Sequence, residues 1–304
     1  MNPIVPGNKS DRTGSSGIIR KAIAQINLRY AALQRDVLAI FSRIQYLRLN
    51  EVDFGRVSYM LTPDQMRIVD REIELALSKW IADGNSPAEF HWYAQYDEAA
   101  NFLGTTQTAA NLGRASEAYA IARQLSNIVR TDPYRTRLAM AQFRSYEHWV
   151  SLSSQAKSDL TSIITRAVSD GKNPKAVRTE IAERIEVSRS RAALYAQTDI
   201  TGTLREARVA EAEQAEIDLG IKTGLLWTSA LKTTTRPWHA SRHGNAYSRA
   251  EVKAFYSENG NSFNCYCSIT ETLLDKDGNP ILSDKLKKAM ALEKKAWKAT
   301  HVGR

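Results

Sequence analysis

Apolar side chains recur along residues 18–49 at alternating spacings of four and three residues. This period of 3.5 residues keeps one apolar seam on one side of a helix, and it predicts a long helix packed lengthwise against a partner helix. The partner is a helix of the same chain, another copy or another protein, and the first of these is the commonest outcome. The seam consists of Ile19, Ile23, Ile26, Tyr30, Leu33, Val37, Ile40, Ile44 and Leu47.

A second helical pattern begins at Thr62 and Pro63. A threonine hydroxyl caps the first backbone N–H groups of a helix, and proline suits the first helical position because its missing N–H is not needed there. An apolar stripe follows as far as Trp80, and Asp83-Gly84 predicts the end of this candidate partner helix. Further helices are expected to about Arg130, to about Val150, and over residues 154–169, 174–186 and 189–219.

The pattern changes after Gly220. Short apolar runs at 225–228 and 262–272 predict strands, and Asp277-Gly278-Asn279 indicates a hairpin turn. The expected fold is therefore mainly α, with a long N-terminal helix, a helical body and a small α+β C-terminal module from about residue 221.

Four parts of the chain differ in composition and pattern. Residues 1–17, rich in Pro, Gly and Ser, are expected to form a flexible tail, and 18–150 a helical N-terminal region. Residues 151–280 hold the last helices and the α+β module, and 281–304 form a basic tail or helix. No apolar run approaches the roughly 18 residues of a membrane span.

Basic residues are concentrated at the two ends of the chain. The net charge is +9, residues 1–56 hold nine Lys and Arg against four Asp and Glu, and residues 281–304 hold seven against two. Such ends favour contact with DNA or an acidic protein surface, although solvated helix faces give the same pattern. The candidate contact residues are Arg20, Lys21, Arg29, Arg35, Arg43, Lys285, Lys287, Lys288, Lys294, Lys295 and Lys298.

The two cysteines, Cys265 and Cys267, are separated by one residue. On a strand they face the same side, and His239 and His243 share a helical face if Pro237 begins a helical turn. Zn²⁺ accepts Cys sulfur and His nitrogen in a tetrahedral arrangement, so these four side chains are a candidate zinc site that stabilises a module with little core. The competing interpretation is that the cysteines are small buried hydrophobic residues and that His239 hydrogen-bonds a carbonyl.

An ordered set of motifs runs through the C-terminal half. It consists of Thr198-Asp199 on a helix, Trp227, Arg236-x-x-His239, Gly244 and Asn264-Cys265-x-Cys267. In this order the motifs resemble the C-terminal domain of the phage Mu F-like head morphogenesis family, also called minor capsid or minor head proteins. The resemblance covers roughly residues 165–272 and identifies 151–280 as the corresponding domain.

This chain departs from the family pattern at three positions. Lys232 stands where the family usually has an acid, Thr234 where a second arginine is common, and His243 where an acid often precedes the glycine. The resemblance implies a structural, non-enzymatic protein of a tailed phage, located in the virion at the head or portal vertex and in the host cytoplasm during assembly. The implied partners are the portal protein, other head proteins and phage DNA, and the implied roles are head assembly and DNA packaging or ejection.

The alternative function is a DNA-acting, metal-dependent hydrolase or toxin-like enzyme that uses the His/Cys cluster. Such nucleases commonly hold a hard cation with carboxylates, and Asp199 and Glu206 are the acids available for that role. Arg236 is expected to pair with an acid such as Asp199, and Trp227 is expected to lie in the core.

Overall fold

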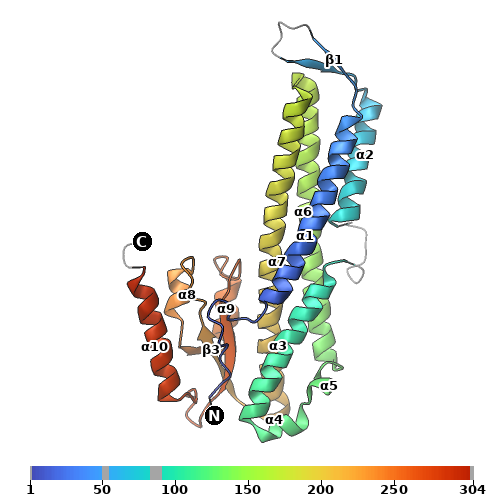
Figure 1. Ribbon diagram of the computed structural model, residues 1–304. Helices are drawn as coiled ribbons and strands as arrows, with labels where there is room; N and C mark the ends of the chain where they lie inside the picture. The colour runs from blue at the N-terminus through green and yellow to red at the C-terminus, as the bar shows by residue number, and fades with distance from the viewer. Residues whose placement is uncertain (1, 50–54, 83–90, 302–304) are drawn as a thin grey trace. The chain divides into compact units, whose positions relative to one another are not determined.

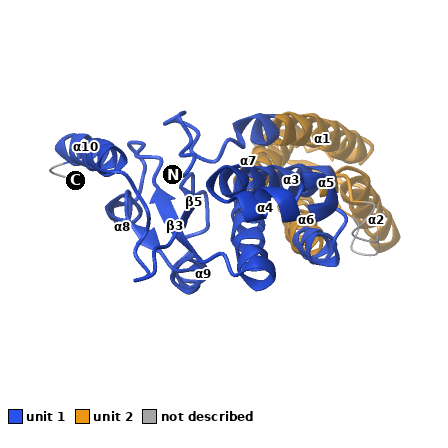
Figure 2. Ribbon diagram, turned by 90° about the horizontal axis from the view of Figure 1, so that it is seen from below, with its two compact units in different colours: residues 1–20, 95–141, 197–304 blue, residues 21–94, 142–196 orange. Residues whose placement is uncertain are grey.

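The fold was analysed in a computed structural model, which describes residues 2–49, 55–82 and 91–301 (Figure 1). The mainly α prediction is confirmed, with a small sheet in the C-terminal region. The chain divides into two compact units, drawn in different colours in Figure 2. Unit 1 comprises residues 1–20, 95–141 and 197–304, and unit 2 comprises residues 21–94 and 142–196.

Unit 2 is built on the heptad-patterned helix. It contains most of α1 (Ser16–Ser42), the hairpin β1 (Tyr46–Arg48) and β2 (Val57–Tyr59), α2 (Pro63–Trp80), and parts of α6 (Asp132–Asp170) and α7 (Pro174–Leu219). The α1 seam from Ile26 to Ile40 is buried by helices of its own chain. Trp80 of α2 donates from Nε1 to Asp36 Oδ2 at 2.7 Å, and Tyr30 Oη lies 3.0 Å from Ser188 Oγ of α7.

Four predicted helix boundaries were wrong. The helix expected to run to about Arg130 ends at Ala115, and two short helices, Glu117–Ala122 and Leu125–Ile128, follow it. The first helix ends at Ser42 rather than near residue 49, and Leu47 lies exposed in β1. The breaks expected near residues 150–154 and 187–188 do not exist, because α6 and α7 are continuous. No proline or glycine occurs at either place, so nothing in the backbone interrupts the helix. The expected start of α2 is confirmed by the Thr62 capping box, whereas its expected stop at Asp83-Gly84 lies outside the described residues.

Unit 1 combines helices with the predicted α+β module. Its helical part holds α3 (Ala94–Ala115), α4 (Glu117–Ala122), α5 (Leu125–Ile128) and the remainders of α6 and α7. Its module holds β3 (Thr223–Thr228), α8 (Pro237–Ser241), β4 (Ala246–Tyr247), α9 (Arg249–Ser257), β5 (Ser268–Leu273) and α10 (Asp284–Ala299). The sheet order is β4-β3-β5, with both pairings antiparallel.

The module is attached to the helices of unit 1 by a buried ion pair. Glu271 of β5 accepts from Arg208 of α7 at 2.9 and 2.7 Å, and it also accepts from Thr108 and Asn111 of α3. Gly104 permits close contact between α3 and α7, because a Cβ there would lie 2.4 Å from the Leu204 carbonyl oxygen. The strand that follows the cysteines is thus held against both helices.

The N-terminal segment, expected to be a flexible tail, packs onto unit 1. Arg12, Thr13 and Ser15 are buried, and Arg12 donates to Glu293 of α10 at 2.5 Å. The predicted basic C-terminal segment is the helix α10, with Met290 and Trp297 on its buried side. Within the described ranges, no helix combines the length and the apolar character needed to cross a membrane.

Candidate metal centre

Three of the four predicted zinc ligands lie together. His239 comes from α8, and Cys265 and Cys267 come from the segment just before β5. His239 Nδ1 lies 3.5 Å from Cys265 Sγ and 3.8 Å from Cys267 Sγ, and all three ligand atoms lie within 4.8 Å of one another. Each side chain is buried.

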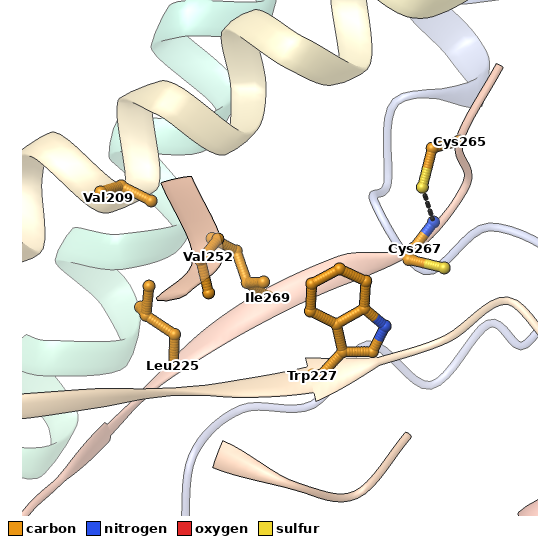
Figure 3. Packing of buried hydrophobic residues seen from close by; sticks show 7 residues of the cluster. All are labelled: Val209, Leu225, Trp227, Val252, Cys265, Cys267 and Ile269. Carbon is orange, nitrogen blue, oxygen red and sulfur yellow. Dashed lines mark hydrogen bonds between the residues drawn. The ribbon is translucent and has the colours of Figure 1, made fainter. Parts of the chain in front are cut away.

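The cysteines were expected within a strand, but the strand begins one residue after Cys267. The preceding chain turns instead, and Asn264 has a left-handed φ of 50°. This turn folds Cys267 back so that its backbone N–H donates to Cys265 Sγ at 3.4 Å, the dashed line in Figure 3. The turn, rather than strand alternation, therefore brings the two thiols together.

The separations suit a tetrahedral zinc ion. Zn–S distances of about 2.3 Å and Zn–N distances of about 2.0 Å at a tetrahedral angle place the nitrogen and each sulfur about 3.5 Å apart. Of the two observed nitrogen–sulfur distances, that to Cys265 is 3.5 Å and matches this value, and that to Cys267, 3.8 Å, is slightly longer. The nitrogen–sulfur distances are therefore compatible with a shared zinc ion.

Asn261 sets the tautomer of His239. Asn261 Nδ2 donates to the Phe255 carbonyl oxygen at 2.9 Å, which leaves Oδ1 to face His239 Nε2 at 3.3 Å. Trp238 Nε1 also donates to this oxygen, at 2.8 Å. Because Oδ1 is an acceptor, the proton resides on Nε2 and the lone pair of Nδ1 points at the sulfurs, as in a metal-bound histidine.

Hydrogen-bonding groups also surround the sulfurs. Ser229 Oγ lies 3.4 Å from Cys267 Sγ, and Tyr256 Oη lies 3.7 Å from Cys265 Sγ. The hydrogen bond from Cys267 lowers the pKa of Cys265 well below its usual value. The hydrogen bond to Cys265, together with burial, raises the pKa of Cys267. Cys265 is therefore the more acidic of the two thiols.

A buried cation lies beside the cluster. The Arg205 guanidinium lies over the Tyr256 ring, 4.0 Å from its centroid, and only 4% of the residue is exposed. Among the described residues, no carboxylate lies within ion-pair distance of the Arg205 guanidinium, and Arg205 Nη1 has no hydrogen-bond partner. The charge of Arg205 further lowers the pKa of Cys265. A buried cation of this kind is stabilised by nearby thiolates.

His243, the fourth predicted ligand, does not join the cluster. The helix α8 ends at Ser241, so the shared helical face expected for His239 and His243 does not extend that far. His243 Nδ1 accepts from the Ser229 backbone N–H at 3.0 Å, and Nε2 lies 3.3 Å from Glu293 Oε2 of α10. Burial lowers the pKa of His243 to about 4.

Two of the family motif residues support the cluster. Thr198 Oγ1 accepts from the backbone N–H of Asn264 at 3.0 Å, which fixes the residue before Cys265 to α7. Trp227 is fully buried, as expected, and stacks on Tyr256 at 5.2 Å between ring centroids. Figure 3 shows Trp227 beside the two cysteines in this core.

Gly244 has a φ of 84°, which explains a glycine at that motif position. The expected pairing of Arg236 with Asp199 is wrong. Arg236 instead donates to the carbonyl oxygens of Gly260 and Phe263, at 2.9 and 2.6 Å, and so holds the turn before the cysteines. In the part of the chain that the structure describes, neither Asp199 nor Glu206 belongs to the group of side chains able to share a metal.

A pocket of about 260 Å³ opens directly over the cluster. Besides the three candidate ligands, its lining consists of Ala230, Lys232, Thr234, Thr235, Arg236, Phe263, Asn264 and Tyr266. Lys232 and Arg236 are its charged members, and the lining includes no carboxylate. An ion bound to the three ligands therefore faces a positively charged pocket.

The predicted basic contact residues differ in how they are engaged. Five lysines of α10 are exposed and make no ion pair within the described ranges, whereas Lys294 donates to the Ser241 carbonyl oxygen. On α1, Arg43 pairs with Glu72, Arg29 is engaged with Trp80 and Trp92, and Arg20, Lys21 and Arg35 are exposed. The five exposed lysines are Lys285, Lys287, Lys288, Lys295 and Lys298.

Residues 158–270 match a family model described as Phage Mu protein F like protein. This segment is similar to the phage Mu F-like family. The resemblance deduced from the motifs is thereby confirmed, and the Mu F-like segment lies within the predicted range 151–280. The match relates this segment to phage head morphogenesis proteins. No curated protein and no solved structure gave a significant match.

The sequence did not reveal Asn261 or Arg205 as parts of the Mu F-like site. Asn261 is four residues before Cys265 and has no motif around it, and Arg205 resembles any other helical arginine. Only burial shows that one fixes the histidine tautomer and that the other supplies charge. No spacing rule would have found them.

Proposed function

We propose that this protein is a minor head protein of a tailed phage that docks at the portal vertex or inside the head. In this role it acts in head assembly and in DNA packaging or ejection, without catalysing a reaction. The observation that carries the proposal is the family match over residues 158–270. It fits a chain that combines a Mu F-like segment with an exposed basic helix.

The helix α10 is the proposed contact with DNA or with an acidic portal surface. Its Met290 and Trp297 side is buried, and Glu293 fixes it to Arg12 and His243. Its five exposed lysines therefore project from an anchored helix rather than from a mobile tail. A set of fixed cations attracts a polyanion over several ångströms and loses that attraction as salt rises.

DNA retention tests this contact. Replacing all five exposed lysines with glutamine should weaken binding and reduce the slope of log affinity against log salt by up to about 4.5, since each phosphate contact contributes about 0.9. A variant with arginine at the same five positions keeps the charge and should bind like the parent. An unchanged slope in the glutamine variant would show that α10 does not contact DNA.

Co-expression with the portal protein of the same phage tests the docking site. We expect a complex that survives size-exclusion chromatography and that the same glutamine variant weakens if α10 is the docking surface. If no complex forms with the portal protein or with assembled heads, docking on the portal is refuted.

Within this structural role, we propose that His239, Cys265 and Cys267 bind zinc and so stabilise the module. The supporting observations are the nitrogen–sulfur distances and the tautomer that Asn261 imposes on His239. Zinc would cross-link α8 to the turn before β5 and so stabilise the core that they share. At a free zinc concentration 100 times the dissociation constant, binding would add about 2.7 kcal/mol to the free energy of unfolding.

Metal analysis of purified protein tests the site. The parent should bind one zinc per chain, and a chelator should lower its melting temperature. His239→Gln and Cys265→Ser should lose the metal, whereas His243→Gln should retain it despite lower stability. Loss of zinc in His243→Gln would show that His243 is a fourth ligand, as the sequence predicted. Absence of zinc from the parent protein would refute the metal proposal.

The alternative function, a metal-dependent hydrolase, receives no support from the pocket. Its lining contains no carboxylate to act as a general base toward a metal-bound water. DNA cleavage in the presence of a divalent metal, abolished by His239→Gln, would overturn the non-enzymatic proposal.

A further inference from the structure

The proposed zinc site lacks one ligand. Tetrahedral zinc takes four ligands, and structural sites normally obtain all four from the protein. Over the described ranges, His239, Cys265 and Cys267 are joined by no further His, Cys, Asp or Glu. His243, the nearest candidate by sequence, is engaged by Ser229 and Glu293.

A fourth ligand could reach the proposed zinc from the 260 Å³ pocket, because the three protein ligands line it. The ligand side chains are each only 2–3% exposed, so an incoming group must be slender enough to reach them. An extended side chain meets this requirement, whereas the broad backbone of duplex DNA does not.

The charge of the pocket selects the kind of ligand. Zn²⁺ with two thiolates is neutral, so Lys232 and Arg236 in the lining and Arg205 behind the cluster leave a positive environment. The guanidinium of Arg236 is already engaged by carbonyl oxygens, which makes Lys232 the cation able to pair with a ligand. Asp11 acts on Lys232 through its charge, but it accepts hydrogen bonds from Thr13, Gly14 and Ser16 and forms no ion pair with it within the described part.

The loop that carries Lys232 is fixed in place. The Lys232 backbone N–H donates to Thr235 Oγ1 at 2.8 Å, and its carbonyl oxygen accepts from Trp297 Nε1 of α10 at 2.9 Å. The ammonium group lies over the Tyr266 ring, 3.4 Å from the centroid. Leu231 is held at a left-handed φ of 50°, which an unsupported loop would relax. These contacts hold the ammonium at the pocket.

We propose that the fourth zinc ligand is a carboxylate from an acidic side chain of a partner head protein, guided to the metal by Lys232. The carboxylate oxygen would displace the water that completes the zinc coordination in the free protein, with no covalent bond made or broken. Zinc readily accepts Asp and Glu oxygen as a ligand. The inference rests on the proposed zinc site and gives it a second role, as a docking point completed by assembly.

Cobalt substitution tests the inference, since the visible absorption of Co²⁺ reports its ligands. Acetate is the probe, with inorganic phosphate and imidazole as comparison ligands at the same pH and ionic strength. We expect a saturable spectral change with acetate at lower concentrations than with either comparison ligand. Lys232→Gln should weaken acetate binding about fivefold, whereas Lys276→Gln, which changes an exposed lysine that does not line the pocket, should leave it unchanged.

The outcomes separate the two proposals. If the protein binds no cobalt, the metal site itself is wrong and the inference falls with it. If cobalt binds with the thiolate-containing spectrum but acetate causes no change, the metal site stands and the open position is refuted. Tighter binding of phosphate or imidazole than of acetate refutes the carboxylate, and equal acetate binding by Lys232→Gln refutes the role of that lysine.

Discussion

The buried pair Arg208–Glu271 offers the sharpest test of how the module is held. Glu271 accepts four side-chain hydrogen bonds, two from Arg208 and one each from Thr108 and Asn111, and neither charged side chain is more than 2% exposed. The substitution Glu271→Leu removes the acceptor and leaves the guanidinium in the core. Arg208 Nη1 still donates to Gln107, but this hydrogen bond does not neutralise the charge of the guanidinium.

Breaking a buried ion pair by removing one partner costs about 3–5 kcal/mol, because the other charge remains unpaired. Thr108 and Asn111 each keep another acceptor, the carbonyl oxygens of Gly104 and Glu271, so they add little. The double variant Arg208→Met with Glu271→Leu leaves no buried charge, and it should be more stable than Glu271→Leu alone by about 2 kcal/mol or more.

Urea denaturation followed by near-ultraviolet circular dichroism measures both effects. With a slope of about 2 kcal/mol per molar, Glu271→Leu should lower the midpoint by roughly 1.5–2.5 M. Glu213→Gln breaks the exposed pair with Lys253 and should change stability by less than about 1 kcal/mol. If the double variant is as unstable as the sum of its single variants, the paired charges are not the reason for the cost.

Three further predictions concern pH, helix packing and metal. Burial lowers the pKa of both His91 and His243 to about 4, so their neutral forms stabilise the fold above pH 6.5 and this contribution is lost as the pH falls toward 4. The melting temperature should therefore fall over that range, and less steeply in His91→Phe; an unchanged pH profile in this variant would contradict the assignment. Gly104→Ala should cost about 1–3 kcal/mol because its Cβ meets the Leu204 carbonyl, whereas Gly202→Ala, with nothing within 4 Å, should stabilise by about 0.5–1 kcal/mol. Equal effects of the two alanines in thermal unfolding would refute the close helix contact. Chelation should lower the melting temperature of the parent but not of Cys265→Ser, and an equal drop in both would mean that the chelator acts elsewhere.

Periodicity predicted most of the fold. The α1 seam, the Thr62 cap and strand β3 follow from side chains that interact within a few residues or along one face, and such patterns are visible in any window of sequence. Boundaries without a proline or glycine were less predictable. The helices α6 and α7 pass through Ser-rich and Val-Ser stretches because tertiary packing outweighs the weak helix propensity of those residues.

The candidate site divides in the same way. The sequence by itself determined the chemistry, since it supplies one Cys-x-Cys, a histidine after a helix-starting proline and the family motif. Only the tertiary structure decided the membership of the site. It ended α8 before His243, folded Cys267 back onto Cys265, and brought Asn261 and Arg205 to the cluster from positions that no pattern marks. The physical reason is that ligand type is a property of single residues, whereas convergence, burial and tautomer depend on contacts between segments far apart in the chain.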